Sequence, residues 1–142
     1  KAIDIFTSEK YLEKTGKDQL EEILNYFETS FDTTQDFYRF IYYFDSYIKR
    51  QNIESSNLQN YENTIEEITQ IAFQAIEKGF SDGSIFYPNE NIQTLTLTVM
   101  HSFFSLAQKL SLSGGMLSQD ISNPPKNQLE ILKNLILSSL SK

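Results

Sequence analysis

The chain has 142 residues and a net charge of −7, with 12 Lys and Arg against 19 Asp and Glu. This length fits one domain with a sizeable core, and the acidic balance argues against a nucleic-acid-binding surface. There is no Cys, which excludes disulfides and thiolate chemistry and is compatible with a reducing cytoplasm. No apolar run is long enough to span a membrane, so we expect no membrane association. The unusual feature is the aromatic content, with 11 Phe and 8 Tyr.

The first part of the chain predicts a short helix followed by a longer one. Lys1–Lys14 mixes apolar and charged residues and is interpreted as a short helix or the tail of one, interrupted at Thr15-Gly16. Lys17–Phe31 spaces its Leu, Ile and Phe residues three and four apart. That spacing predicts an amphipathic helix with its Glu residues turned outward.

The richest aromatic segment is Asp36–Gln51, which is also predicted to be a helix. Its rings have two interpretations. They could form a core built from large side chains, or they could line a hydrophobic ligand cavity in which Tyr hydroxyls supply polar handles. Both interpretations stay open at this stage.

The longest helical pattern is Leu58–Ile85, which we expect to be the central helix of the domain. Apolar residues at steps of three and four trace one face, and Glu, Gln and Asn occupy the other. The pattern predicts that the helix closes at Gly79, because glycine readily adopts the left-handed conformation of a helix end. Asp82-Gly83-Ser84 is predicted to be a turn.

Two further helices are predicted at the end of the chain. Asn91–Ser113, with Asn89 as the expected N-cap, contains an alternating stretch that would suit a strand, but its apolar residues keep helical spacing over a wider window. Lys126–Ser141 follows Pro124-Pro125, a typical helix start, and is apolar around more than half of its circumference. The sequence therefore predicts an all-α protein.

The sequence contains no arrangement of residues that is typical of a catalytic site. His101 is the single His, and a lone His on an apolar helix is usually a hydrogen-bonded core or pocket residue. The adjacent pairs Glu21-Glu22 and Glu66-Glu67 point in different directions on a helix and are expected to face solvent. We therefore expect no catalytic residues, no metal site and no cofactor, and we do not expect an enzyme.

Three stretches carry a resemblance to a known family. They are the corner Ile76–Ile85, the helix start Asn89–Ile92 and the closing helix Leu129–Leu140. Together they resemble the C-terminal domain of TetR-family transcriptional regulators, from about Gly16 onward. The resemblance implies a bundle of about five to six helices, with residues 1–15 as the tail of a linking helix and residues 16–142 as the effector-binding and dimerisation domain. The family's helix-turn-helix DNA reader precedes this domain and is not found in the sequence.

The resemblance implies a cytoplasmic transcriptional regulator, such as a repressor, whose DNA binding is controlled by a small lipophilic effector. The alternatives are a helical protein-interaction module with no small-molecule ligand and, less in keeping with the sequence, an all-α enzyme built on His101. From the expected helix faces, the predicted lining of the effector site is Phe27, Phe40, Tyr43, Phe44, Tyr47, Tyr61, Ile65, Ile68, His101 and Phe104.

The last two helices carry more apolar surface than one internal contact can cover. A two-fold partner would cover the excess by forming a four-helix bundle across the interface, so we expect a homodimer. The residues predicted for this interface are Met100, Leu129, Leu132, Ile136 and Leu140.

Overall fold

The computed structural model describes residues 2–31, 56–88, 91–113 and 124–141, and all the regular structure in these ranges is helical. The elements are η1 (Ala2–Thr7), α1 (Glu9–Leu12), α2 (Gly16–Thr29), α4 (Ser56–Asp82), α5 (Ile92–Ser113) and α7 (Pro125–Ser139). The predicted all-α bundle is confirmed. The predicted aromatic helix Asp36–Gln51 lies outside the described residues. None of the described helices is long and apolar enough to cross a bilayer.

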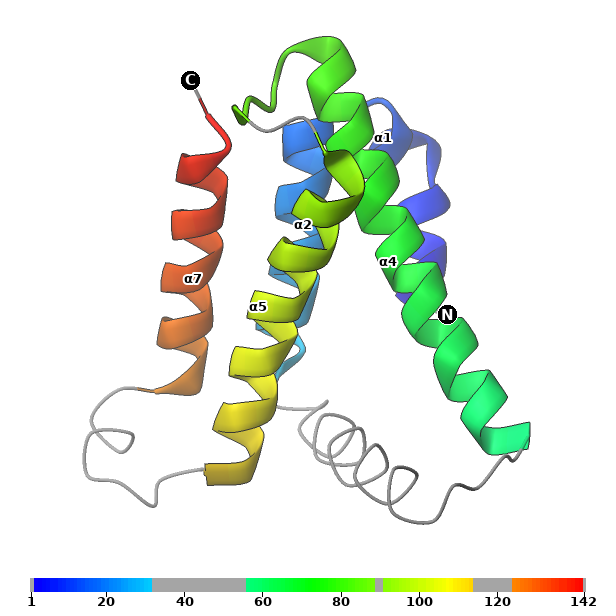
Figure 1. Cartoon of the computed structure of the whole chain (residues 1–142), viewed down its shortest axis with the longest axis vertical. Helices are drawn as coiled ribbons and strands as arrows, with labels where there is room; N and C mark the ends of the chain where they lie inside the picture. The colour runs from blue at the N-terminus through cyan, green and yellow to red at the C-terminus, as the bar shows by residue number, and fades with distance from the viewer. Residues whose placement is uncertain (1, 32–55, 89–90, 114–123, 142) are drawn as a thin grey trace.

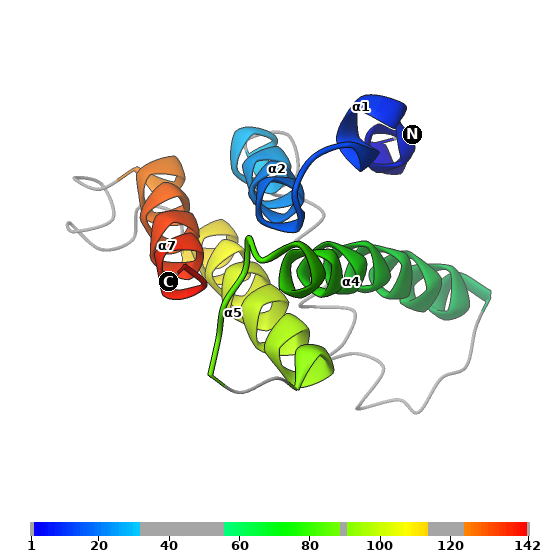
Figure 2. The same cartoon turned by 90° about the horizontal axis from the view of Figure 1, so that it is seen from above.

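The four long helices enclose one core. α2 contacts α4 and α7, and α5 contacts the same two helices on the other side. α2 and α5 run in one direction while α4 and α7 run in the other, so each helix is antiparallel to both neighbours (Figure 1). Viewed from above, the segment of η1 and α1 and the helix α7 lie on opposite flanks of α2 (Figure 2).

The helix starts follow from local side chains. The Thr15 hydroxyl accepts a hydrogen bond from the Asp18 amide at 3.2 Å, and Asn91 Oδ1 accepts one from the Thr94 amide at 3.1 Å. Pro125 occupies the first turn of α7, where its missing amide proton costs nothing. The expected cap Asn89 lies outside the described residues, and Asn91 caps α5. The helical interpretation of Asn91–Ser113 is confirmed over the strand.

The predicted end of the central helix was wrong. α4 continues through Gly79 to Asp82, and the positive φ of 80° belongs to Gly83. Gly79 is instead buried in a close crossing of α4 with α2. A Cβ on Gly16 would collide with the backbone of Gly79 and with the carbonyl oxygen of Ala75. Gly79 therefore serves helix packing, and Gly83 closes the helix.

Hydrogen bonds reinforce this crossing. Asp82 Oδ2 accepts from the Gly16 amide at 2.9 Å, and Ser84 Oγ accepts from the Lys17 amide at 3.0 Å. These amides belong to the first turn of α2, which has no partners within its own helix. We call the set of Gly16, Lys17, Gly79, Asp82 and Ser84 the joint.

The end of α7 also reaches the joint. The Phe86 amide donates to the Leu140 carbonyl at 2.7 Å, and Lys17 Nζ bonds Ser141 Oγ. Three segments that are distant in sequence are thereby fastened at one end of the bundle.

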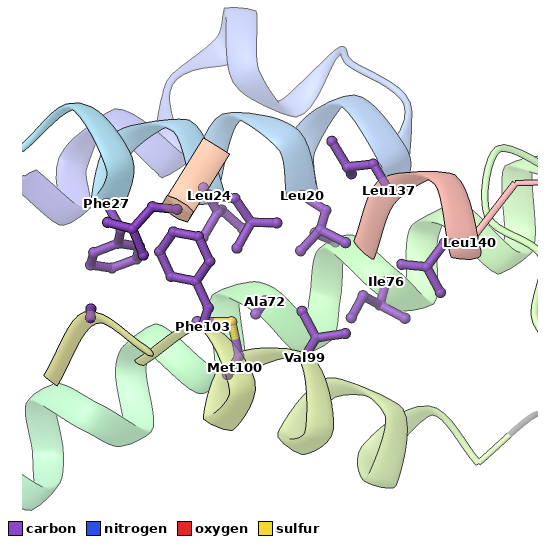
Figure 3. Packing of buried hydrophobic residues seen from close by; sticks show 14 of the residues in the cluster. Leu20, Leu24, Phe27, Ala72, Ile76, Val99, Met100, Phe103, Leu137 and Leu140 are labelled. Carbon is purple, nitrogen blue, oxygen red and sulfur yellow. The ribbon is translucent and has the colours of Figure 1, made fainter. Parts of the chain in front are cut away.

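The core between the four helices is apolar. Figure 3 shows Leu20 and Leu24 of α2 meeting Ile76 of α4 and Phe103 of α5, with Leu137 of α7 alongside. Burying side chains of this size from four helices supplies the main stabilisation of the bundle.

Candidate functional site

A continuous path of aromatic rings crosses the bundle. Phe6 of η1 meets Tyr26 of α2 with ring centroids 5.9 Å apart, Tyr26 meets Phe27 at 5.4 Å, and Phe27 meets Phe104 of α5 at 5.1 Å. All three contacts are edge-to-face, a favourable arrangement for ring quadrupoles. We call Phe6, Tyr26, Phe27 and Phe104 the ring path. It connects the N-terminal segment with the interior face of α5.

The structure brings part of the predicted effector lining together. Phe27 is buried and in contact with Phe104, and Ile68 of α4 packs against the same core. Tyr61 and Ile65 belong to α4, but the structure does not describe their side chains. The remaining aromatic candidates, Phe40, Tyr43, Phe44 and Tyr47, also lie outside the described residues.

His101 is not among the buried candidates. Its side chain is exposed, as is that of Leu97 one turn earlier, because both lie on the side of α5 turned away from the buried Met100 and Phe103. The expectation that His101 is a core or pocket residue is therefore corrected for the described part of the chain.

The N-terminal segment is fastened to the bundle by its polar groups as well as by Phe6. Gln19 Nε2 donates to the Tyr11 carbonyl at 3.1 Å, and Lys78 Nζ of α4 donates to the Leu12 carbonyl at 2.6 Å. The Tyr11 ring is buried, and burial together with the nearby Glu22 carboxylate raises the pKa of its hydroxyl. Tyr11 is therefore neutral at physiological pH and serves as packing.

The most exposed large apolar side chains of α7 lie on its outward side. Ile131 is 59% exposed and Leu135 is 60% exposed. Beside them, a groove of about 220 Å³ separates α5 from α7. Its lining is Tyr87, Leu95, Thr98, Val99, Ser102, Leu135, Ile136, Ser139 and Leu140. We call Ile131, Leu135 and this groove the outer face.

The predicted dimer residues divide between this face and the core. Met100, Leu129 and Leu140 are 1%, 0% and 1% exposed, so almost none of their surface is available to a partner, although Leu140 is one of the residues that line the groove. Leu132 and Ile136 are partly exposed at the border of the core. The choice of Met100, Leu129 and Leu140 is corrected, because Leu129 and Leu140 lie on the side of α7 that α2 and α5 cover, and Met100 of α5 is buried in the same core.

Ile131 and Leu135 were not among the residues predicted for the interface, although they are the most exposed apolar residues of α7 and their spacing of four is visible in the sequence. The sequence alone could not show which of two apolar stripes on α7 faces inward. That choice depends on the neighbouring helices.

The charged residues do not assemble a reactive centre in the described part of the chain. Glu66 and Glu67 are exposed, as expected, whereas Glu21 and Glu22 are half-buried. Glu22 lies 3.4 Å from Lys14 Nζ in a partly exposed ion pair. Within the described ranges, no three His, Asp or Glu side chains are grouped to hold a metal ion.

Comparisons with family models, with characterised proteins and with solved structures give no match to this chain. The resemblance to the TetR family therefore rests on the sequence features described above.

Proposed function

We propose that this chain is the ligand-sensing and dimerising domain of a TetR-like transcriptional regulator. The observation that carries the proposal is the outer face, in which the last two long helices lie side by side and turn Ile131 and Leu135 toward solvent. The helix order and the closed corner after α4 agree with the arrangement that the resemblance implies. In this proposal, DNA is bound by a preceding helix-turn-helix, and the protein acts in the cytoplasm.

The partner that fits the outer face is a second copy of the chain. An isologous contact would place α5 and α7 against their copies, so that the exposed Leu135 of each copy approaches the groove of the other. The groove is lined by small residues such as Ser102 and Ser139 beside larger apolar ones, which suits the insertion of an apolar side chain. This contact would give the four-helix interface expected from the sequence.

The ring path supports the sensing part of the proposal. A lipophilic effector that entered beside Phe27 and Phe104 would have to displace one of these rings. Because Tyr26 and Phe6 continue the ring path, such a displacement would shift their ring contacts and with them the N-terminal segment. In a regulator of this kind, that segment leads to the DNA reader, and the effector would shift the population between two arrangements.

A specific observation also favours the alternative, a helical interaction module without a small-molecule ligand. Phe27 and Phe104 contact each other directly, so at this point between α2 and α5 the rings pack on each other, as they would in a core that holds no ligand. The two functions differ in what binds. Lipophiles would stabilise a sensing domain, whereas a helical peptide would stabilise an interaction module.

The dimer is tested by Leu135→Glu, with Asn134→Glu as the control at a neighbouring exposed position of the same helix. We expect the wild-type chain to sediment as a dimer, Leu135→Glu as a folded monomer and Asn134→Glu as a dimer, because only the first places a charge in the apolar contact. Sedimentation velocity at micromolar concentration measures the state. A wild-type chain that sediments at 16.5 kDa would rule out the dimer.

The sensing function is tested by thermal unfolding in the presence of a panel of neutral and cationic lipophiles. A binder at a concentration of 100 times its Kd should add about 2.7 kcal/mol of stability. Phe104→Ala should change that response more than Leu97→Ala, which alters an exposed residue of the same helix. If no lipophile raises the melting temperature, the sensing function fails for this domain.

A further inference from the structure

A polar cluster joins α7 to α2 on the side opposite the outer face. Lys133 Nζ of α7 lies 2.7 Å from Glu28 Oε2 and donates to Asn25 Oδ1 at 2.6 Å. The side chains of Lys133 and Glu28 are only 12% and 14% exposed. We call Lys133, Glu28 and Asn25 the clamp. Hydrogen bonds to charged groups that are shielded from water are among the stronger ones in proteins.

The geometry of an α-helix relates the clamp to the outer face. Successive residues are rotated by about 100°, so residues two positions apart point in directions about 160° apart. Ile131 and Leu135 each lie two positions from Lys133. When Lys133 is held against α2, both Ile131 and Leu135 must therefore point away from α2. Their high exposure agrees with this relation.

The buried apolar side chains of α7 lie on the same side as Lys133. Leu129 and Leu137, each four positions from Lys133, are buried in the core, Leu132 and Ile136 border it, and Ile131 and Leu135 form another apolar stripe. Apolar packing is not directional, and a partial roll of α7 that brought Leu132 and Ile136 inward would still bury apolar side chains. A directional polar contact distinguishes between such alternatives, as a single buried polar residue does for register in coiled coils.

We propose that Lys133 is a positioning residue that sets the rotation of α7 about its own axis and thereby selects Ile131 and Leu135 as the surface offered to a second copy of the chain. This inference rests on the proposed dimer. It assigns the clamp to partner selection, in addition to any contribution it makes to the stability of the single chain.

The test compares Lys133→Met with Glu28→Gln, and uses Lys126→Met as a control at an exposed position of α7. The dimer dissociation constant is measured by sedimentation equilibrium, and helix content is measured on the same samples. We expect Lys133→Met to raise the dissociation constant by about tenfold or more, Glu28→Gln to raise it less, and the control to leave it within about threefold of wild type. Helix content should stay unchanged.

A double variant separates positioning from loss of packing. Exchanging the charges, with Lys133→Glu and Glu28→Lys together, restores an ion pair between the two helices. We expect it to recover most of the lost dimer affinity, to within about threefold of wild type.

The possible failures are distinguishable. A wild-type dimer whose dissociation constant is unchanged by both Lys133→Met and Glu28→Gln would overturn the clamp proposal and leave the dimer intact. A wild-type monomer would overturn the dimer and the clamp proposal with it. If Lys133→Met lowers the helix content, the clamp proposal is judged from the dimer dissociation constants of Glu28→Gln and of the exchanged pair, each compared with wild type.

Discussion

The joint and the ring path connect α2 to two different neighbouring helices by different means. At the joint, α2 and α4 meet backbone against backbone, with Gly16 facing Gly79 and the Asp82 carboxylate bonding the Gly16 amide. Along the ring path, α2 meets α5 through side chains, with the Phe27 ring against the Phe104 ring. α4 lies close to α2 and α5 near the joint and diverges from α5 toward its own first residues (Figures 1 and 2).

The contact between α2 and α4 at the joint is rigid, whereas the contacts along the ring path can rearrange. Glycines in contact and fixed amide hydrogen bonds leave no freedom for α2 to slide along α4. Aromatic rings can change rotamer and re-form edge-to-face contacts at modest cost. An effector or partner that alters this domain would therefore act on the ring path, with the joint as the fixed reference.

The largest expected effect comes from Gly16→Ala. The added Cβ would collide with the Gly79 backbone, and backbone atoms cannot rotate out of the way as a side chain can. We expect a loss of about 4 kcal/mol or more in the free energy of unfolding, above the usual cost of overpacking. Urea denaturation followed by circular dichroism measures it.

Gly83→Ala is the matched control for Gly16→Ala. A Cβ at Gly83 meets no atom within contact distance, and only the positive φ of 80° opposes it. The expected cost is about 1 kcal/mol. Equal losses at Gly16 and Gly83 would show that the joint is not a tight contact.

The next effect is expected for Phe27→Ala. Removing a buried ring from the ring path should cost about 3 kcal/mol, since Phe104 and Tyr26 both lose their contact and a cavity remains. The loss of stability should be confined to the region around the ring path. Native-state hydrogen exchange should speed up in the second half of α2 and around Phe104, while amides at the joint keep their relative protection. Uniform loss of protection would contradict the division into two regions.

The smallest expected effect is that of Asp82→Asn, and it depends on pH. Burial is the largest single influence and opposes the charged form, but the hydrogen bonds from Ser84 and the Gly16 amide, together with Lys78, outweigh it and hold the pKa of Asp82 below its ordinary value of 3.8. A lowered folded pKa adds stability above the unfolded value and loses it as pH falls through the folded value.

We therefore expect Asp82→Asn to cost about 1 kcal/mol at neutral pH, a typical value for a capping hydrogen bond. The difference from wild type should shrink as pH falls well below 3.8, where the wild-type carboxyl is protonated. Urea midpoints of both proteins at neutral and acidic pH give the comparison. A difference that stays constant across this range would show that the charge of Asp82 contributes nothing.

Much of the fold could be predicted because helical periodicity is a local property. The spacing of Leu, Ile and Phe residues located α2, α4, α5 and α7 to within a few residues. The end of α4 was misplaced because Gly79 looks like a helix terminator in sequence. Gly79 instead serves the close contact with Gly16, which is far away in the chain. No local sequence pattern reveals that contact.

The candidate site was less predictable for a related reason. α7 is apolar on two sides, so spacing could not decide whether Leu129 and Leu140 or Ile131 and Leu135 face the core. The decision depends on α2 and α5 and on the contact of Lys133 with Glu28. His101 was expected in the core or a pocket because it is a lone His on an apolar helix. Its direction on α5, about 100° from that of the buried Met100, places it in solvent.

The connection of Leu140 and Ser141 to the joint has a consequence for how the domain folds during synthesis. The Phe86–Leu140 and Lys17–Ser141 bonds need residues from near both ends of the chain. α2 and α4 can meet at Gly16 and Gly79 while the chain is still growing, but the fastening of α7 must wait until residues 140 and 141 have left the ribosome. The nascent domain should therefore pass through a state in which α2 and α4 are paired and the apolar faces of α5 and α7 are uncovered. That is the stage at which a nascent chain is most prone to aggregate.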